Sequence, residues 1–303
     1  MNVVLAADTN FAKQLAVAVA GLARSSDGSL HRVYVLHSGY TSELKADVER
    51  ATDNRLEFHW LETSVSDEHA DALIDYLATA TLFRLRMEDL LPADVHRVIY
   101  LDADVIVRAP LAALWEADLG SSLAGGVRDA IVPWSGSALE WRRLGVPPQR
   151  PYFNAGVMVV PLDRWREERV SARALEFLLG GGLNYGDQCA LNLAIAGRWT
   201  PLDPMWNLQS WHLAGDTCPA WVVEQQGVLE RALEDPAVVH FTHSNRQRPW
   251  EAWPAHQYRD EWYALLDVTP WSGWRPVSRH PSKLSRAVGR ARRTGQVLFH
   301  GRY

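Results

Sequence analysis

Strand-like and helix-like segments alternate through the first third of this 303-residue chain, and this alternation constrains the fold most. The strand-like runs are short and rich in Val, Leu, Ile and Tyr, and they cover 2–7, 32–37, 55–61 and 97–101. Helical patterns lie between them, over 11–24, 43–51 and part of 67–91. Strands that alternate with helices predict an α/β fold with a mostly parallel central sheet and helices on both faces.

The rest of the chain shows the same kinds of signal with wider spacing. Further strands are predicted over 122–128, 153–161 and 237–239. Helices are predicted from Asp163 to about Leu179, where three glycines stop the pattern, and over 187–196. From Trp199 to Trp274 the sequence predicts mainly loops.

Two aspartates interrupt the apolar run 98–107 and give the clearest chemical signal. Residues i and i+2 of a strand point to the same side, so Asp102 and Asp104 aim two carboxylates at one spot at or near the end of the strand. Close carboxylates repel each other, and burial makes each charge costlier. A hard divalent cation such as Mn²⁺ or Mg²⁺ relieves both problems and keeps positions open for a diphosphate. The alternative is a strand-to-turn junction with ordinary turn aspartates.

Three other polar motifs follow predicted strands or precede a predicted helix. Asp8 ends the first strand, where it could line the same crevice as the aspartate pair or simply cap a helix. Asn154-Ala155-Gly156 offers small residues that let a ligand approach the backbone, with a strand bulge or tight corner as the alternative. Asp187-Gln188 could bind sugar hydroxyls or cap a helix.

The segment 240–250 joins a histidine, arginines and Pro-Trp after the last predicted strand. His240 could complete a metal site with the two aspartates, although a single histidine is more often structural. Arg246 and Arg248 could bind phosphate.

Composition indicates an ordinary water-soluble domain, with 47% hydrophobic and 22% charged residues. The sequence has no apolar run long enough to span a membrane, and its first residues lack the basic start of a secretion signal. Two cysteines are too few for a disulfide framework. We therefore expect a cytoplasmic protein.

Charge is distributed unevenly between the body and the end of the chain. Residues 275–303 hold eight Lys and Arg and no acidic residue, so with a total of −5 the remaining residues 1–274 carry −13. An acidic body argues against nucleic-acid binding. The basic tail predicts peripheral contact with the inner face of an anionic membrane, or contact with a phosphorylated glycolipid. A solvated, disordered end is the alternative.

Taken together, these segments resemble the retaining glycosyltransferase family that includes the bacterial lipopolysaccharide α-galactosyl- and α-glucosyltransferases and glycogenin. The resemblance runs from Asn2 to about Trp274 and keeps the order of the motifs in the family. The matching segments are Ala6-Ala7-Asp8 with Asn10 and Phe11, Phe83-Arg84, Tyr100–Asp104, Tyr152–Val157, Asp187-Gln188, and His240-Phe241 with Arg248-Pro249-Trp250.

The resemblance implies a GT-A type nucleotide-diphospho-sugar transferase domain over 1–274, followed by the basic tail 275–303. It implies that Asp102, Asp104 and His240 hold Mn²⁺ or Mg²⁺ and that Gln188 and Asp187 are the candidate catalytic residues beside the sugar. The implied donor-binding residues are Ala6, Ala7, Asp8, Asn10, Phe11, Arg84, Asp102, Ala103, Asp129, Asn154, Ala155 and Arg248.

The implied activity is transfer of glucose or galactose from UDP-glucose or UDP-galactose to a hydroxyl of a glycan or glycolipid, most of all a lipopolysaccharide-type acceptor. A nucleotide-sugar-binding protein without transfer activity and a self-glucosylating primer protein are the alternatives. The chain departs from the family near its phosphate-side loop, where His243 stands at a usual glycine and Arg248 replaces a usual lysine.

Overall fold

The structure is a computed structural model that describes residues 1–28, 30–63, 82–130, 132, 134–213, 226–242, 248–251 and 256–276. The predicted helix start within 67–81, His243, Arg246 and all but the first two residues of the basic tail lie outside the described residues. In the part that is described, no helix is both long enough and apolar enough to cross a membrane.

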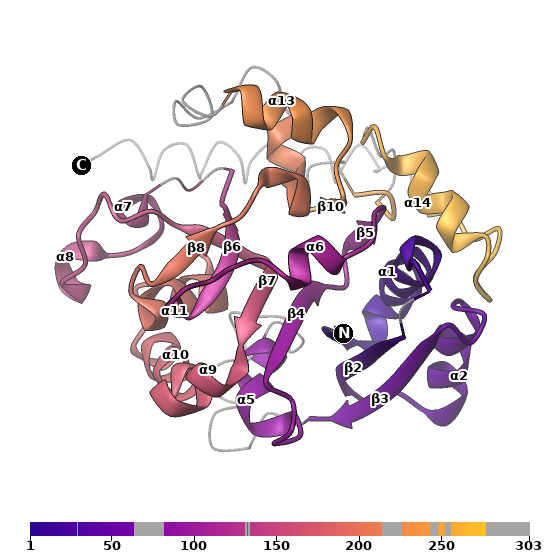
Figure 1. Ribbon diagram of the computed structural model, residues 1–303, viewed down its shortest axis with the longest axis horizontal. Helices are drawn as coiled ribbons and strands as arrows, with labels where there is room; N and C mark the ends of the chain where they lie inside the picture. The colour runs from indigo at the N-terminus through magenta and orange to yellow at the C-terminus, as the bar shows by residue number, and fades with distance from the viewer. Residues whose placement is uncertain are drawn as a thin grey trace, which may run out of the picture.

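Seven strands form the central sheet. They are β1 (Asn2–Asp8), β2 (His31–Ser38), β3 (Leu56–Glu62), β4 (Arg97–Asp102), β6 (Ala124–Arg128), β7 (Phe153–Pro161) and β8 (Trp199–Pro201). Their order is β3-β2-β1-β4-β7-β6-β8 (Figure 1). All neighbours pair in parallel except β7, which runs antiparallel to β4 and β6. The predicted mostly parallel sheet is confirmed.

A small second sheet brings a distant part of the chain to the end of β4. Its strands are β5 (Val105–Val107), β9 (Leu208–Gln209) and β10 (Val238–His240), in the order β5-β10-β9. The last residue of β10, His240, pairs with Val105, and the amide of Phe241 donates to the carbonyl oxygen of Asp104 at 3.0 Å, an ordinary hydrogen-bond distance. Backbone pairing therefore carries His240 to the two aspartates.

The helices vary from single turns to four turns. The α-helices are α1 (Ala12–Ser25), α2 (Ser42–Arg50), α5 (Met87–Leu90), α6 (Ala112–Trp115), α7 (Ser135–Ala138), α8 (Trp141–Leu144), α9 (Leu162–Glu168), α10 (Val170–Gly180), α11 (Gly186–Ile195), α13 (Gln226–Glu234) and α14 (Arg259–Leu266). Short 3₁₀ turns are η1 (Thr9–Phe11), η2 (Arg84–Arg86), η3 (Pro204–Trp206) and η4 (Ser210–Leu213).

The central sheet separates two apolar cores because successive side chains of each strand face opposite sides. Along β4, Ile99 and Leu101 pack with α1 and α14, whereas Val98 and Tyr100 pack with α9, α10 and α11. In Figure 1 the first group of helices lies to the right of β4 and the second group to its left. Helices on both faces, as predicted, leave the strand ends as the accessible edge.

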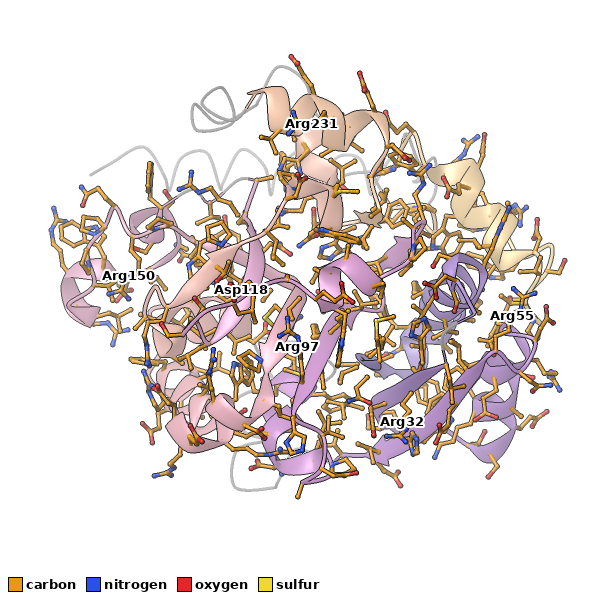
Figure 2. The ribbon with its side chains drawn as sticks, in the orientation of Figure 1. Arg32, Arg55, Arg97, Asp118, Arg150 and Arg231 are labelled. Atoms are coloured by element: carbon orange, nitrogen blue, oxygen red, sulfur yellow. The ribbon has the colours of Figure 1, made fainter. Side chains whose placement is uncertain are left out.

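Charged side chains mostly lie outside these layers. Arg32, Arg55 and Arg231, labelled in Figure 2, are exposed. A buried arginine in the interior of the molecule is therefore exceptional and is described with the site below.

The predicted single helix over 163–179 is wrong, because two helices occupy this stretch. Arg169 adopts a left-handed conformation with φ of 51° and separates α9 from α10. The first turn of α10 has backbone amides without a partner inside the helix, and the carboxylate of Glu88 accepts from one of them, the amide of Ser171, at 3.1 Å. A carboxylate from a distant helix thus permits a break that the local sequence does not signal.

The stretch 199–274, predicted as mainly loops, contains more regular structure than expected. It holds β8, β9, β10, α13 and α14 among its described residues. The strand predicted over 237–239 is present as β10, shifted by one residue. The other elements are short, and tertiary pairing rather than local periodicity sets them, which is why a pattern-based prediction passes over them.

Candidate active site

Asp102, Asp104 and His240 converge at the carboxyl end of β4. Asp102 ends the strand, Asp104 lies in the turn that follows, and His240 ends β10. His240 Nε2 lies 3.2 Å from Asp104 Oδ1 and 3.6 Å from Asp102 Oδ2. One ligand atom from each residue falls within 4.8 Å of the others. The predicted convergence of the aspartates is confirmed, although a turn and not an extended i, i+2 backbone produces it.

Arg84 is a buried guanidinium that holds this corner together. Its Nη1 donates to the carbonyl oxygen of Ala155 at 2.8 Å, and its Nη2 contacts Asp102 Oδ1 at 3.0 Å. Its Nε lies 2.6 Å from Asp187 Oδ2 without hydrogen-bond alignment, so this contact is an ion pair. The Tyr100 hydroxyl also donates to Asp102 Oδ1. These contacts occupy Oδ1 and leave Oδ2 of Asp102 facing His240.

The acidic groups of the site respond differently to their surroundings. Burial raises the pKa of Asp187 to about 6, and the nearby Arg84 only partly opposes this. Burial also acts to raise the pKa of Asp104, but His240 and Arg248 outweigh it and the net shift is downward. Burial acts to lower the pKa of Arg84, yet Asp102 and Asp187 raise it above its ordinary value. Arg84 therefore stays charged.

The donor set fits a divalent cation. Asp102 and Asp187 both pair with the buried guanidinium of Arg84, so their two carboxylates exceed its one positive charge. Asp104 faces His240 and lies within the influence of Arg248. Two carboxylate oxygens and an imidazole nitrogen are ligand types that Mn²⁺ and Mg²⁺ accept. A cation placed between them would satisfy the excess negative charge.

Gly156 makes room for the ligand side chains. A Cβ at this position would lie 2.1 Å from His240 Cε1 and 2.7 Å from Asp102 Oδ2, closer than any real contact. The register between β6 and β7 shifts opposite this point, so the bulge offered as an alternative from sequence is present. The glycine is needed because the side chains of His240 and Asp102, and not only a ligand, approach its Cα.

A buried polar network occupies the sugar side of the predicted site. Asp129 Oδ2 accepts from Asn154 Nδ2 and from Gln188 Nε2, each at 3.1 Å. The other amide atom of Gln188, Oε1, accepts from the backbone amide of Ala155 at 3.0 Å. Both ends of the Gln188 amide are thus engaged, and its side chain is held in place.

These groups border a cleft of about 430 Å³ at the carboxyl edge of the sheet. Seven predicted donor-binding residues line it: Ala6, Phe11, Arg84, Asp102, Ala103, Asn154 and Arg248. Asp104, Gln188 and His240 line it as well.

Other predicted residues lie beside the cleft and not in its lining. Ala7 is fully buried and its side chain belongs to the apolar core. Asp8 caps η1, with Oδ1 accepting from the amides of Asn10 and Phe11, and Asn10 itself is exposed. Asp129, Ala155 and Asp187 are buried behind the cleft wall. Capping does not exclude ligand contact, and the donor-binding role of these residues stays a prediction.

Arg248 and Phe11 line the cleft and both contact Trp250. The guanidinium of Arg248 lies 5.9 Å from the Trp250 ring, and its Nε donates to the carbonyl oxygen of Phe241. Phe11 meets the same tryptophan edge to face at 6.4 Å. An aromatic ring and a cation thus flank one end of the cleft.

Sequence reasoning missed Tyr100, Asn207 and Gln209. Tyr100 was named only within the strand and the matching segment Tyr100–Asp104, with no role of its own, yet its hydroxyl reaches Asp102. Asn207 contacts both His240 and Asn154, and Gln209 holds the loop after β6 through Ala130 and Arg128. Asn207 and Gln209 could have been recognised as site residues only if the short strand β9 had been predicted, and the sequence around it has no periodicity that indicates a strand.

The fold, with its cleft beyond the carboxyl ends of a mostly parallel sheet, is the GT-A type of glycosyltransferases. LgtC, a galactosyltransferase solved in complex with donor and acceptor sugar analogs, has this fold; it matches with a TM-score of 0.74 at 23% identity over 89% of this chain and 96% of that one. A family description, glycosyl transferase family 8, matches residues 2–254, and the chain belongs to this family.

Two relatives show how far the similarity extends. General stress protein A of Bacillus subtilis is 26% identical over 281 residues, which cover 90% of this chain and 95% of the relative. Lipopolysaccharide 1,2-glucosyltransferase of Escherichia coli is 23% identical over 279 residues, 89% of this chain and 79% of the relative. The resemblance read from the motifs is confirmed, and the chain is a glycosyltransferase.

Proposed function

We propose that this glycosyltransferase moves glucose or galactose from a UDP-sugar to a hydroxyl of a glycan or glycolipid, with Mn²⁺ or Mg²⁺ and with retention of the α configuration. The observation that carries the proposal is the convergence of Asp102, Asp104 and His240 beside a cleft lined by an aromatic ring and a cation. Two relatives named as a glucosyltransferase and a galactosyltransferase support the hexose.

The chain's own residues divide the donor between them. Phe11 offers a ring for the uracil base, and Asp8 and Asn10 stand next to it at the end of β1. Arg248 offers a fixed positive charge to the diphosphate. Arg84 and the Asp129–Asn154–Gln188 network offer donors and acceptors to the sugar hydroxyls.

The reaction breaks the bond between the anomeric carbon and the diphosphate. A bound divalent cation supplies charge stabilisation for the departing diphosphate. Arg248 adds to this stabilisation from the same side of the cleft. Arg84 and Asp187 keep opposite charges beside the sugar, where positive charge develops on the ring as in other glycosyl transfers.

Retention requires either a covalent intermediate or attack on the face that the leaving group departs from. Gln188 is a poor nucleophile because its amide is neutral and both of its ends are hydrogen-bonded. Asp187 is a better nucleophile chemically, but it is buried and paired with Arg84. We favour attack on the leaving-group face, with the departing phosphate taking the proton of the acceptor hydroxyl.

One relative supports the acceptor, and the charge of the tail supports the location of the enzyme. A lipopolysaccharide-type acceptor is supported by the Escherichia coli relative. The charge of residues 275–303 supports contact of this tail with an anionic membrane from the cytoplasmic side. We therefore treat 1–274 as the transferase domain and the tail as its membrane or acceptor contact.

Radiolabelled transfer with Mn²⁺ and UDP-glucose or UDP-galactose tests the function. We expect Asp102→Asn and Asp104→Asn to abolish transfer while circular dichroism shows an unchanged fold. Asp118→Asn is the matched control, because this exposed aspartate caps the amide of Gly120 and does not line the cleft. Full activity of either site variant contradicts the metal role. Donor binding without transfer would identify a binding protein, and added hexoses in the intact mass would identify a self-glucosylating one.

A further inference from the structure

Asn207 is a fully buried amide between the metal-binding cluster and the sugar-side network. It follows η3 and precedes β9, and none of its surface is exposed. Its Oδ1 lies 2.9 Å from His240 Nδ1, and its Nδ2 lies 3.0 Å from Asn154 Oδ1. One side chain thus touches the histidine of the cluster and an asparagine of the cleft wall.

The direction of each hydrogen bond in the series Asn154–Asn207–His240 follows from the backbone amide of Gly156. The amide of Gly156 can only donate, and it donates to Asn154 Oδ1 at 3.0 Å. The oxygen of Asn154 is therefore the acceptor, and the atom of Asn207 that faces it is the nitrogen. The remaining Asn207 atom is the oxygen, which only accepts, so His240 Nδ1 carries the proton.

A proton on Nδ1 leaves the other ring nitrogen of the neutral imidazole unprotonated. That nitrogen, Nε2, is the one that faces Asp104 Oδ1 at 3.2 Å and Asp102 Oδ2 at 3.6 Å. A metal-binding histidine needs its free lone pair on the side of the ion, and a partner on the other nitrogen fixes this tautomer. The geometry gives Asn207 that role.

We infer that Asn207 is a positioning residue, which holds His240 in the Nδ1–H tautomer and thereby sets the affinity of the site for a divalent cation. The inference rests on the proposed metal-dependent function. The inference adds to the three proposed ligands a fourth residue, Asn207, which influences metal binding although it belongs neither to the cluster nor to the lining of the cleft. The same amide also ties His240 to Asn154, and through Asn154 to Asp129.

Two substitutions separate the hydrogen bond from simple packing. Asn207→Leu keeps a similar volume and removes both polar atoms. Asn207→Asp keeps an acceptor for His240 Nδ1 but loses the donor to Asn154. Asn192→Leu is the matched control, because Asn192 is another buried amide, bound to the backbone of Phe153 and Gln188 and without a hydrogen bond to His240 or Asn154.

The first measurement is Mn²⁺ binding by isothermal titration calorimetry with UDP present. We expect Asn207→Leu to weaken Mn²⁺ binding by roughly 10- to 100-fold, as loss of an outer partner of a metal-bound histidine does. Asn207→Asp and Asn192→Leu should bind Mn²⁺ nearly as the wild type does. Wild-type affinity in Asn207→Leu overturns the inference, and so does an equal loss in both Asn207 variants.

The second measurement reads the tautomer without metal. Nitrogen-15 NMR of histidine-labelled, metal-free protein should show a proton on His240 Nδ1, whether or not Nε2, which faces the carboxylates, carries one too; the variant His240→Asn identifies the signal. Asn207→Leu should lose this signature and Asn207→Asp should keep it. An Nε2–H tautomer in the wild type overturns the inference. Absence of Mn²⁺ binding in the wild type would instead contradict the proposed function, and the tautomer would still test Asn207.

Discussion

The substitution Gly156→Ala tests the architecture of the site through a single methyl group. The added Cβ would lie 2.1 Å from His240 Cε1 and 2.7 Å from Asp102 Oδ2. Since non-bonded carbon atoms rest about 3.5 Å apart, the imidazole must move by about 1.4 Å. Metal–ligand distances vary by only about 0.2 Å in working sites, so the displaced ring no longer completes the cluster.

The magnitude follows from ligand linkage. A ligand at about 100 times its dissociation constant stabilises the folded state by about 2.7 kcal/mol. If Gly156→Ala weakens binding about 100-fold, the same ligand concentration contributes only about 0.4 kcal/mol. Overpacking adds a cost of about 1–3 kcal/mol to the metal-free protein. The variant should therefore unfold earlier and lose nearly all stabilisation by ligand.

Thermal unfolding with and without Mn²⁺ and UDP measures both quantities. Gly125→Ala is the control, because its Cβ would meet the end of the Leu119 side chain at 2.7 Å, away from the cluster. That variant should lose some stability and keep the wild-type response to ligand. A wild-type response in Gly156→Ala would refute the reasoning, since the ligands could not then lie where the structure has them.

Two further outcomes are expected. Burial lowers the pKa of His212 to about 4 from an ordinary 6.5, so the unfolded chain binds a proton at this histidine more readily than the folded protein does. The neutral histidine therefore contributes about 3 kcal/mol to the free energy of unfolding above pH 6.5, and this contribution is lost as the pH falls towards 4. His212→Asn keeps an acceptor for the amide of Gln209, and urea unfolding across this window should show a weaker pH dependence; an unchanged slope contradicts the assignment. Truncation after Trp274 should abolish binding to anionic liposomes, because each Lys or Arg near the membrane surface contributes about 1 kcal/mol to binding. Transfer to a soluble acceptor should stay intact. Unchanged sedimentation with liposomes excludes membrane contact through the tail.

Local signals explain why much of the fold could be predicted from sequence. The strand β7 was predicted with its observed bounds because it starts at an aromatic residue, contains the apolar run 157–160 and ends at a proline. The aspartate pair and His240 were assigned to one cluster from the resemblance, and their geometry agrees with it.

Long-range contacts explain what could not be predicted. The break at Arg169 depends on Glu88, and the roles of Asn207 and Tyr100 depend on which side chains the fold brings to them. An asparagine after Pro-Met-Trp has no periodicity that distinguishes a buried hydrogen-bonding residue from a loop residue.

The reversed strand β7 has a consequence for redesign. Because β7 begins where β6 ends, the excursion over 130–151, with α7 and α8, leaves and re-enters the sheet at the cleft. Its two ends are clamped by the Asp129 amide on the carbonyl oxygen of Tyr152 and by the bond from Asn154 to Asp129. The excursion also places Ala138, Leu139 and Val146 in one apolar cluster with Cys189 and Leu193 of α11. An engineer who exchanges it for a segment of different length must therefore keep these apolar contacts to leave the seven-stranded scaffold intact.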